Sequence, residues 1–169
     1  KYFYASYTAN LGKTNKSKEI LNSALKSHPR NLLLNQYKLD LNLGKNNSAF
    51  DCKNKEHVIA EILYITSNAL SSQSIYPLSD FYLNLAKYLN KDFHSYETLL
   101  AENFYNVDNF EEAKTVYNRL GKKGKAFQWH SSKQLARIYI KENNKEFAFK
   151  LLGDAYNNLV NKNIYETFD

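Results

Sequence analysis

The stretch NFEEAKTVYNRL, residues 109–120, decides the fold class of this chain. Asn109 stands where a helix N-cap belongs, and Glu112 follows three residues later, close to the pattern of a capping box. A small residue, Ala113, lies in the middle of the apolar positions, where a leucine would bury more surface. That small residue predicts a close contact with a second helix. The apolar positions recur every three to four residues, as on one face of an α-helix, at Phe110, Ala113, Val116, Tyr117 and Leu120.

Pairs of small residues recur along the chain with the same internal spacing. In each pair, the first small residue precedes the second by twelve positions, and two of the pairs are offset from each other by 35 residues. Two helices of a hairpin approach closely only where both carry a small side chain, so the spacing predicts repeated antiparallel helix pairs. The pairs are Ala5 with Ser17, Ala101 with Ala113, and Ala136 with Ala148.

The rest of the chain shows the same helical character. Candidate turns divide it into about nine segments with apolar spacing near 3.6, and none shows the alternation of a strand. The chain has only 5 Gly and 2 Pro among 169 residues, which argues against a turn-rich all-β protein. We therefore expect an all-α chain of helical hairpins joined by short turns.

These positions resemble the tetratricopeptide repeat (TPR) family. In that family, a Leu-Gly or Leu-Ala pair and an aromatic residue mark the first helix of a repeat. Ala, an aromatic residue and Ala mark the second helix, and a Pro follows. The resemblance implies a right-handed α-solenoid, an α-α superhelix of antiparallel helix hairpins. The residues that carry it are Ala5, Ser17, Leu21, Ala24 and Pro29, then Ser67, Leu70 and Ala86, then Leu100, Ala101, Phe104, Ala113 and Tyr117, then Leu135, Ala136, Tyr139, Ala148, Leu152 and Ala155.

The resemblance implies that residues 1–169 form a single solenoid, although the sequence departs from the family pattern in places. Residues 31–56 show one helix and then a polar loop where a second helix is expected. The layout resembles segments of long bacterial TPR arrays. Because the chain begins at Lys1 and contains no Met, we expect it to be a segment of a longer protein. A targeting signal would precede it, so cytoplasmic and periplasmic locations both stay open. The expected repeats cover about 1–31, 57–93, 94–128 and 129–162.

A TPR solenoid implies a non-enzymatic scaffold that binds a protein or peptide through a concave groove lined by the first helices. Lys133, Arg137 and Lys141, each four residues apart, would form a basic stripe on one helix face. That stripe fits either a cradle for an acidic segment or a solvated face, and the partner's identity stays open. The expected groove positions are Glu61, Tyr64, Asn68, Ser71, Ser95, Thr98, Glu102, Tyr105, His130, Lys133, Arg137 and Ile140.

Two other functions stay open. A net charge of +6 and a pI near 9.2 permit a helical-repeat protein that binds RNA or another anionic polymer. Pentatricopeptide repeats also have a 35-residue period and bind single-stranded RNA, but no recurring pair of base-reading polar residues is present here. The third alternative is an accessory segment of a larger enzyme.

The sequence shows no catalytic, cofactor or metal motif. Gly12-Lys13-Thr14 resembles the end of a phosphate-binding loop, but Tyr7 stands where that loop needs a glycine. A pair of Cys52 with His57 is conceivable, although a lone loop thiol is the favoured interpretation, and one cysteine forms no internal disulfide. The four histidines lack metal-ligand spacing, and no apolar run reaches membrane-spanning length.

Overall fold

The computed structural model describes residues 1–46 and 49–159. Every regular element in these residues is an α-helix, and nine helices are present, which confirms the all-α prediction for the described part of the chain. The chain divides into two compact units. Unit 1 comprises Lys1–Ser48 with Gly121–Asp169, and unit 2 comprises Ala49–Leu120.

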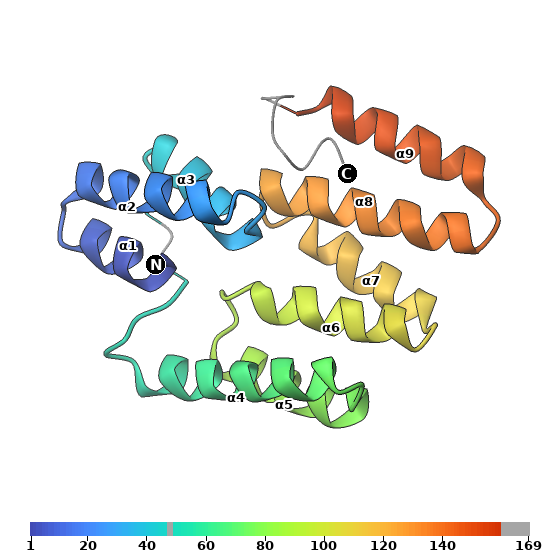
Figure 1. Cartoon of the computed structure of the whole chain (residues 1–169), viewed down its shortest axis with the longest axis horizontal. Coiled ribbons are helices and arrows are strands. Elements are labelled where there is room, and N and C mark those ends of the chain that lie inside the picture. The colour runs from blue at the N-terminus through green and yellow to red at the C-terminus, as the bar shows by residue number, and fades with distance from the viewer. Residues whose placement is uncertain (47–48, 160–169) are drawn as a thin grey trace. The chain divides into compact units, whose positions relative to one another are not determined.

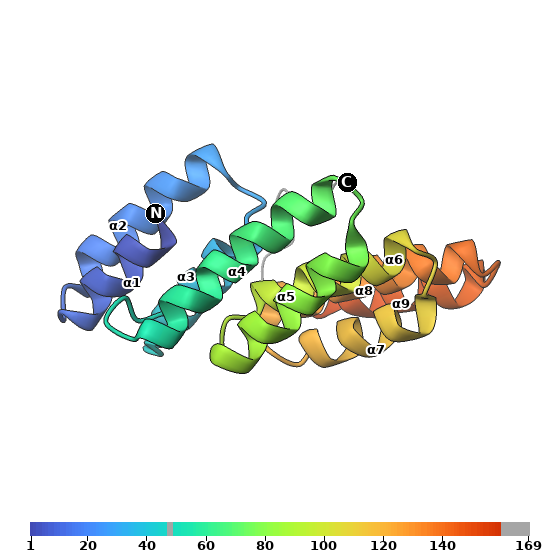
Figure 2. The same cartoon turned by 90° about the horizontal axis from the view of Figure 1, so that it is seen from below.

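Unit 2 contains two consecutive helical hairpins (Figures 1 and 2). The first and second helices of each hairpin pack together, and the second helix of the first hairpin also packs on the first helix of the next. This is the chain of hairpins expected from the spacing of small and large apolar residues. The helices are α4 (Lys55–Ser72), α5 (Tyr76–Leu89), α6 (Ser95–Asn106) and α7 (Phe110–Leu120).

Unit 1 joins two hairpins through a single helix, α3, which packs on α2 and on α8 (Figure 1). The side-chain oxygen of Gln36 on α3 accepts a 3.0 Å hydrogen bond from the backbone N–H of Ala126, 90 residues later. Gly124, just before α8, leaves room for this contact, because a Cβ there would collide with Gln36. The helices are α1 (Tyr2–Asn10), α2 (Thr14–Ser27), α3 (Leu32–Asn42), α8 (Lys125–Lys141) and α9 (Lys145–Asn157).

The small residues of the hairpins are buried at the closest approach of their helices. Ala101 and Ala113 are both fully buried, as are Ala5 and Ser17. The Ser17 hydroxyl donates a 2.7 Å hydrogen bond to the carbonyl oxygen of Ala5, which requires the two backbones to lie close together. These two hairpins therefore close where the twelve-residue spacing places their small side chains.

The second hairpin shows the same contact, although one of its two residues was missed from the sequence. Ser79 donates a 3.0 Å hydrogen bond to the carbonyl of Ser67, again twelve residues earlier, and both residues are fully buried. Ser67 was expected at this position, whereas Ser79 was not. Ala86, also expected, is fully buried in the same hairpin.

In the described part of the chain, five helices end in the same turn, in which one residue adopts a left-handed backbone conformation with φ between 57° and 76°. The following backbone N–H bonds to the carbonyl five residues back, as in Ile75 to Leu70 at 2.9 Å, which is a Schellman ending. α3 ends in this way, as do α1, α4, α6 and α8, the first helices of the four hairpins. The left-handed residues are Gly12, Gly44, Ser74, Asp108 and Asn143.

Candidate protein-binding surface

In unit 2, the first helices of the two hairpins contact each other directly. The Ser71 hydroxyl on α4 donates a 2.6 Å hydrogen bond to Asn103 on α6, and the rings of Tyr64 and Tyr96 lie 5.2 Å apart between their centroids. Residues that sequence reasoning placed on one surface therefore come from adjacent helices. We call this set the α4–α6 face: Glu61, Tyr64, Asn68, Thr98, Glu102 and Tyr105.

Three aromatic rings form the base of the α4–α6 face. Tyr64 contacts Phe93 edge-on, with centroids 6.1 Å apart, and Phe93 contacts Tyr96 at 5.0 Å. Phe93 and Tyr96 are almost completely buried, whereas Tyr64 is half-buried. Burial raises the pKa of Tyr64, and the nearby charges of Glu61 and Glu102 raise it further. Tyr64 therefore stays neutral near pH 7, and the charges of both carboxylates act on it.

Two polar atoms beside these rings are buried without a hydrogen-bond partner, namely Glu61 Oε2 and the Tyr96 hydroxyl. Burial raises the pKa of the Glu61 carboxyl. Burial also raises the pKa of Tyr96, and the charge of Glu61 adds to that shift. A buried oxygen without a partner loses the hydrogen bonds that it would make in water, so this is a costly arrangement.

The other residues of the α4–α6 face are more open. Asn68 and Glu102 are exposed, and the Asn68 amide lies 3.3 Å from the carbonyl oxygen of Tyr64. Thr98 is half-buried and donates a 3.3 Å hydrogen bond to the carbonyl of His94. The ring of Tyr105 leans against Phe110 at 5.8 Å. Asn68 and Glu102 therefore offer exposed side chains that an incoming molecule could reach.

Four of the expected groove residues belong to α8 in unit 1, namely His130, Lys133, Arg137 and Ile140. Burial lowers the pKa of His130 to about 4, and the charges of Lys133 and Arg137 contribute to that shift. His130 is therefore neutral near pH 7. Arg137 is exposed and donates a 2.6 Å hydrogen bond to Gln134 on its own helix, which favours a solvated face for this part of the stripe.

Sequence reasoning missed Glu97, which is almost completely buried on α6. Its carboxylate accepts from Arg119 at 2.6 Å and lies 2.9 Å from Lys87 Nζ and 3.7 Å from His94 Nδ1. Burial alone would raise the pKa of Glu97, but its contacts with His94, Lys87 and Arg119 hold that pKa well below its usual range. This charged cluster ties α5 and α7 to α6, on which part of the α4–α6 face lies.

A second missed residue, Asn103, connects α4, α5 and α6. Its side-chain nitrogen donates to Ser79 at 2.9 Å and to Asp80 at 2.7 Å, while its oxygen accepts from Ser71. Asn103 is fully buried, so these bonds satisfy an amide that would otherwise be costly to bury. Its partners lie 23 to 32 residues away, and no local pattern points to them.

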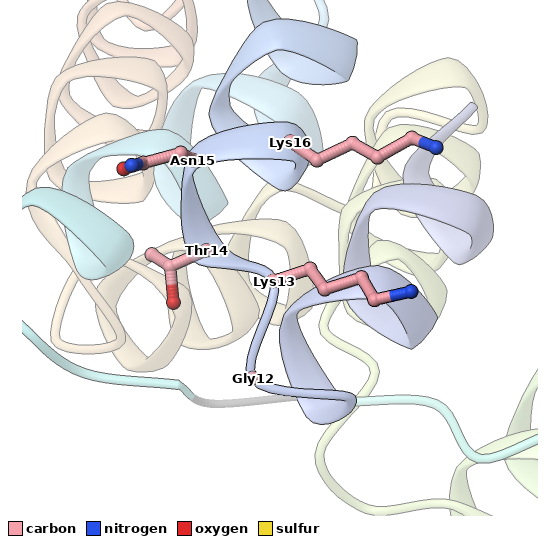
Figure 3. A pocket seen from close by; sticks show the side chains of 5 residues that line it. All are labelled: Gly12, Lys13, Thr14, Asn15 and Lys16. Atoms are coloured by element: carbon pink, nitrogen blue, oxygen red, sulfur yellow. The ribbon is translucent and has the colours of Figure 1, made fainter.

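The Gly-Lys-Thr sequence lies at the turn between α1 and α2, beside a pocket of about 350 Å³ lined by residues 12–16. Lys13 and Lys16 extend to one side of the chain and Thr14 and Asn15 to the other (Figure 3). α1 precedes the turn, whereas a phosphate-binding loop follows a strand. The arrangement therefore lacks the converging groups of a nucleotide site.

Other chemically suggestive residues are engaged elsewhere or stand apart. His57 Nδ1 accepts a 3.0 Å hydrogen bond from the backbone N–H of Asp51, and Cys52 is exposed. Across residues 1–46 and 49–159, no three His, Cys, Asp or Glu side chains are grouped so that they could hold a metal ion. No helix in the described part of the chain is both long and apolar enough to cross a membrane.

Comparison with known proteins gives no relative: no family model matches the chain, and no curated protein or solved structure shows significant similarity to it.

Proposed function

We propose that this chain is a non-enzymatic scaffold of the TPR type, a right-handed solenoid that binds another protein through its first helices. The observation that carries the proposal is the α4–α6 face. The first helices of two successive hairpins meet there, and they present Tyr64, Asn68 and Glu102 on one surface. An aromatic base with polar groups around it is typical of surfaces that hold peptides.

The repeated local geometry supports the same function. Two hairpins close through a hydroxyl-to-carbonyl bond across twelve residues, Ser17 to Ala5 and Ser79 to Ser67. Five helices share one type of ending. Repetition of one hairpin design is how α-solenoids extend a binding surface without enzymatic machinery.

Site-specific photo-crosslinking tests this function. A benzophenone amino acid would replace exposed Asn68 or Glu102 on the α4–α6 face, and exposed Thr115 or Asn118 on α7 as matched controls. We expect a discrete protein adduct in cells from the first two positions and none from the α7 positions. Equal adducts from all four positions, or none from Asn68 and Glu102, would contradict the proposal.

The division of charge supports a second candidate function, binding of an anionic polymer. Unit 2 contains six Lys and Arg and ten Asp and Glu, a net charge of −4. The rest of the chain contains 17 Lys and Arg and seven acids, a net charge of +10. Concentrated positive charge attracts polyphosphates without sequence specificity.

Fluorescence anisotropy with labelled single-stranded RNA separates the two candidates. A polyanion binder would bind RNA at about 50 mM salt and lose affinity steeply by about 200 mM. A protein scaffold would give the α4–α6 adducts in nuclease-treated extracts and show no saturable RNA binding. Nuclease-sensitive adducts together with saturable RNA binding would favour the second function.

A further inference from the structure

The α4–α6 face carries only negative formal charge in a chain whose net charge is +6. No Lys or Arg occurs between Lys55 and Lys87, nor between Lys91 and Lys114. Beyond the first turn of α4, the two helices carry three carboxylates, those of Glu61, Glu97 and Glu102. Glu97 is paired with Lys87 and Arg119. Glu61 and Glu102 are the charged residues of the α4–α6 face, and both raise the pKa of Tyr64.

A second, independent observation points to a ligand at this face. Glu61 Oε2 and the Tyr96 hydroxyl are buried and have no hydrogen-bond partner, and Tyr96 is only 1% exposed. The ring of Tyr96 lies 5.2 Å from that of Tyr64 on α4, and the charge of Glu61 acts on Tyr96, so both groups border the α4–α6 face. A carboxylate only accepts hydrogen bonds, and a phenol can accept them. A hydrogen-bond donor would therefore satisfy either oxygen.

We propose that the α4–α6 face binds a Lys or Arg side chain of an extended basic segment in the partner protein, with Glu61 as its counter-ion. An ammonium or guanidinium group has only donors, so it satisfies both Glu61 Oε2 and the Tyr96 hydroxyl. The half-buried ring of Tyr64 adds attraction for a cation. Glu102, exposed on the next hairpin, would pair with a second basic residue of the segment.

This inference rests on the proposed function and names the chemistry of the partner. An acidic segment, which the basic residues of α8 would favour, would meet two carboxylates at the α4–α6 face and be repelled. The net charge of +10 outside unit 2 repels a basic segment. Binding of a basic segment would therefore be due to the α4–α6 face and not to the overall charge of the chain.

Titration with synthetic peptides tests the proposal on the whole chain. The probes are a nine-residue Gly-Ser peptide with three arginines, its lysine counterpart, and a citrulline counterpart that keeps the shape of arginine and loses the charge. The readout is NMR of ¹³C-labelled Tyr rings and Glu carboxyls. We expect the cationic peptides to shift the Tyr64 and Tyr96 signals and to lower the pKa of Glu61, and the citrulline peptide to do neither.

Two variants sharpen the test. Glu61→Gln should weaken binding of the arginine peptide about tenfold, because a buried charge partner is lost. Glu112→Gln, an exposed acid on α7, should leave the affinity unchanged. Glu61→Gln should melt at or above the temperature of the original chain, because it removes a buried charge, so weaker binding would not reflect unfolding.

Three results would overturn the proposal: equal binding of the citrulline peptide, equal weakening by Glu61→Gln and Glu112→Gln, or a concentration-dependent shift of the same signals without peptide. The last would mean that a second copy of the chain occupies the face. If the photo-crosslinks at Asn68 and Glu102 persist in any of these cases, the scaffold function stands and only the basic partner is rejected. If the crosslinks fail while the peptide result holds, the scaffold function is rejected and the α4–α6 face remains a binding site for a basic side chain.

Discussion

The hydroxyl of Ser17 donates a 2.7 Å hydrogen bond to the backbone carbonyl of Ala5, twelve residues earlier and on the facing helix. Both residues are fully buried. Only small side chains allow a hydroxyl on one helix to reach the backbone of the next, so this bond fixes how closely α1 and α2 pack. Ser79 and Ser67 repeat the relationship in α5 and α4.

Enlarging a small residue at such a contact should destabilise the hairpin. Ala113 on α7 is fully buried, as is Ala101 on α6. We expect Ala113→Leu to lower the free energy of unfolding by about 1–3 kcal/mol through overpacking. Urea denaturation followed by circular dichroism would measure it. Asn118→Leu, exposed on the same helix, is the control, and an equal loss from both variants would contradict the close contact.

Removing the charge of Glu97 should loosen the contacts among α5, α6 and α7. We expect Glu97→Gln to cost about 1.5–3 kcal/mol at pH 7, the range for hydrogen bonds to a charged group. Because the folded pKa of Glu97 lies below its unfolded value, this stability is present above about pH 4.3 and is lost as the pH falls further. The variant and the original chain should therefore converge in stability under strongly acidic conditions.

Glu111→Gln is the matched control for that experiment. Glu111 also pairs with a lysine, Lys114 at 2.6 Å, but 84% of its side chain is exposed to solvent. Exposed pairs contribute little, so we expect a change below about 0.5 kcal/mol. Comparable losses from Glu97→Gln and Glu111→Gln in urea melts would show that burial of the Glu97 cluster has no energetic consequence.

Two glycines should respond in opposite directions to alanine. At Gly124, φ is 157° and a Cβ would collide with the side chain of Gln36, so Gly124→Ala should destabilise unit 1 by about 1–3 kcal/mol. Gly153 lies inside α9 with open space around it, and Gly153→Ala should stabilise by about 0.5–1 kcal/mol. Thermal melts of the two variants would compare them, and a stabilised Gly124→Ala would contradict the contact with Gln36.

His130 should titrate far below an ordinary histidine. Burial is the main cause of its low pKa of about 4, and Lys133 and Arg137 add to it. Because the folded pKa lies below the unfolded value near 6.5, the contribution of neutral His130 to stability is complete above pH 6.5 and is lost between pH 6.5 and 4. A ¹H–¹³C NMR titration should give a midpoint near 4. Replacing both Lys133 and Arg137 with Gln should raise that midpoint, and an unchanged midpoint would exclude their charges as a cause.

The helices and their pairing could be predicted because they depend on neighbours in sequence. The period of apolar residues in residues 109–120 predicts α7, and the twelve-residue spacing predicts its contact with α6. A contact that repeats at a fixed separation requires similar residues at a fixed spacing, and that spacing can be read from the sequence. The same spacing places Tyr64 and Glu102 on the first helices of their hairpins, α4 and α6.

The tertiary structure alone revealed the contacts between distant residues. Gln36 meets Ala126 across 90 residues, and Arg119 reaches Glu97 across 22, without any periodic trace. Glu61 likewise has a buried oxygen without a hydrogen-bond partner and a raised pKa, and its sequence position does not indicate either. Burial depends on everything packed around a side chain. The sequence by itself therefore determined which helices form and which of them pair. The packing of those helices decided which charges are neutralised and which acceptors lack a donor, because both depend on distances that local sequence does not encode.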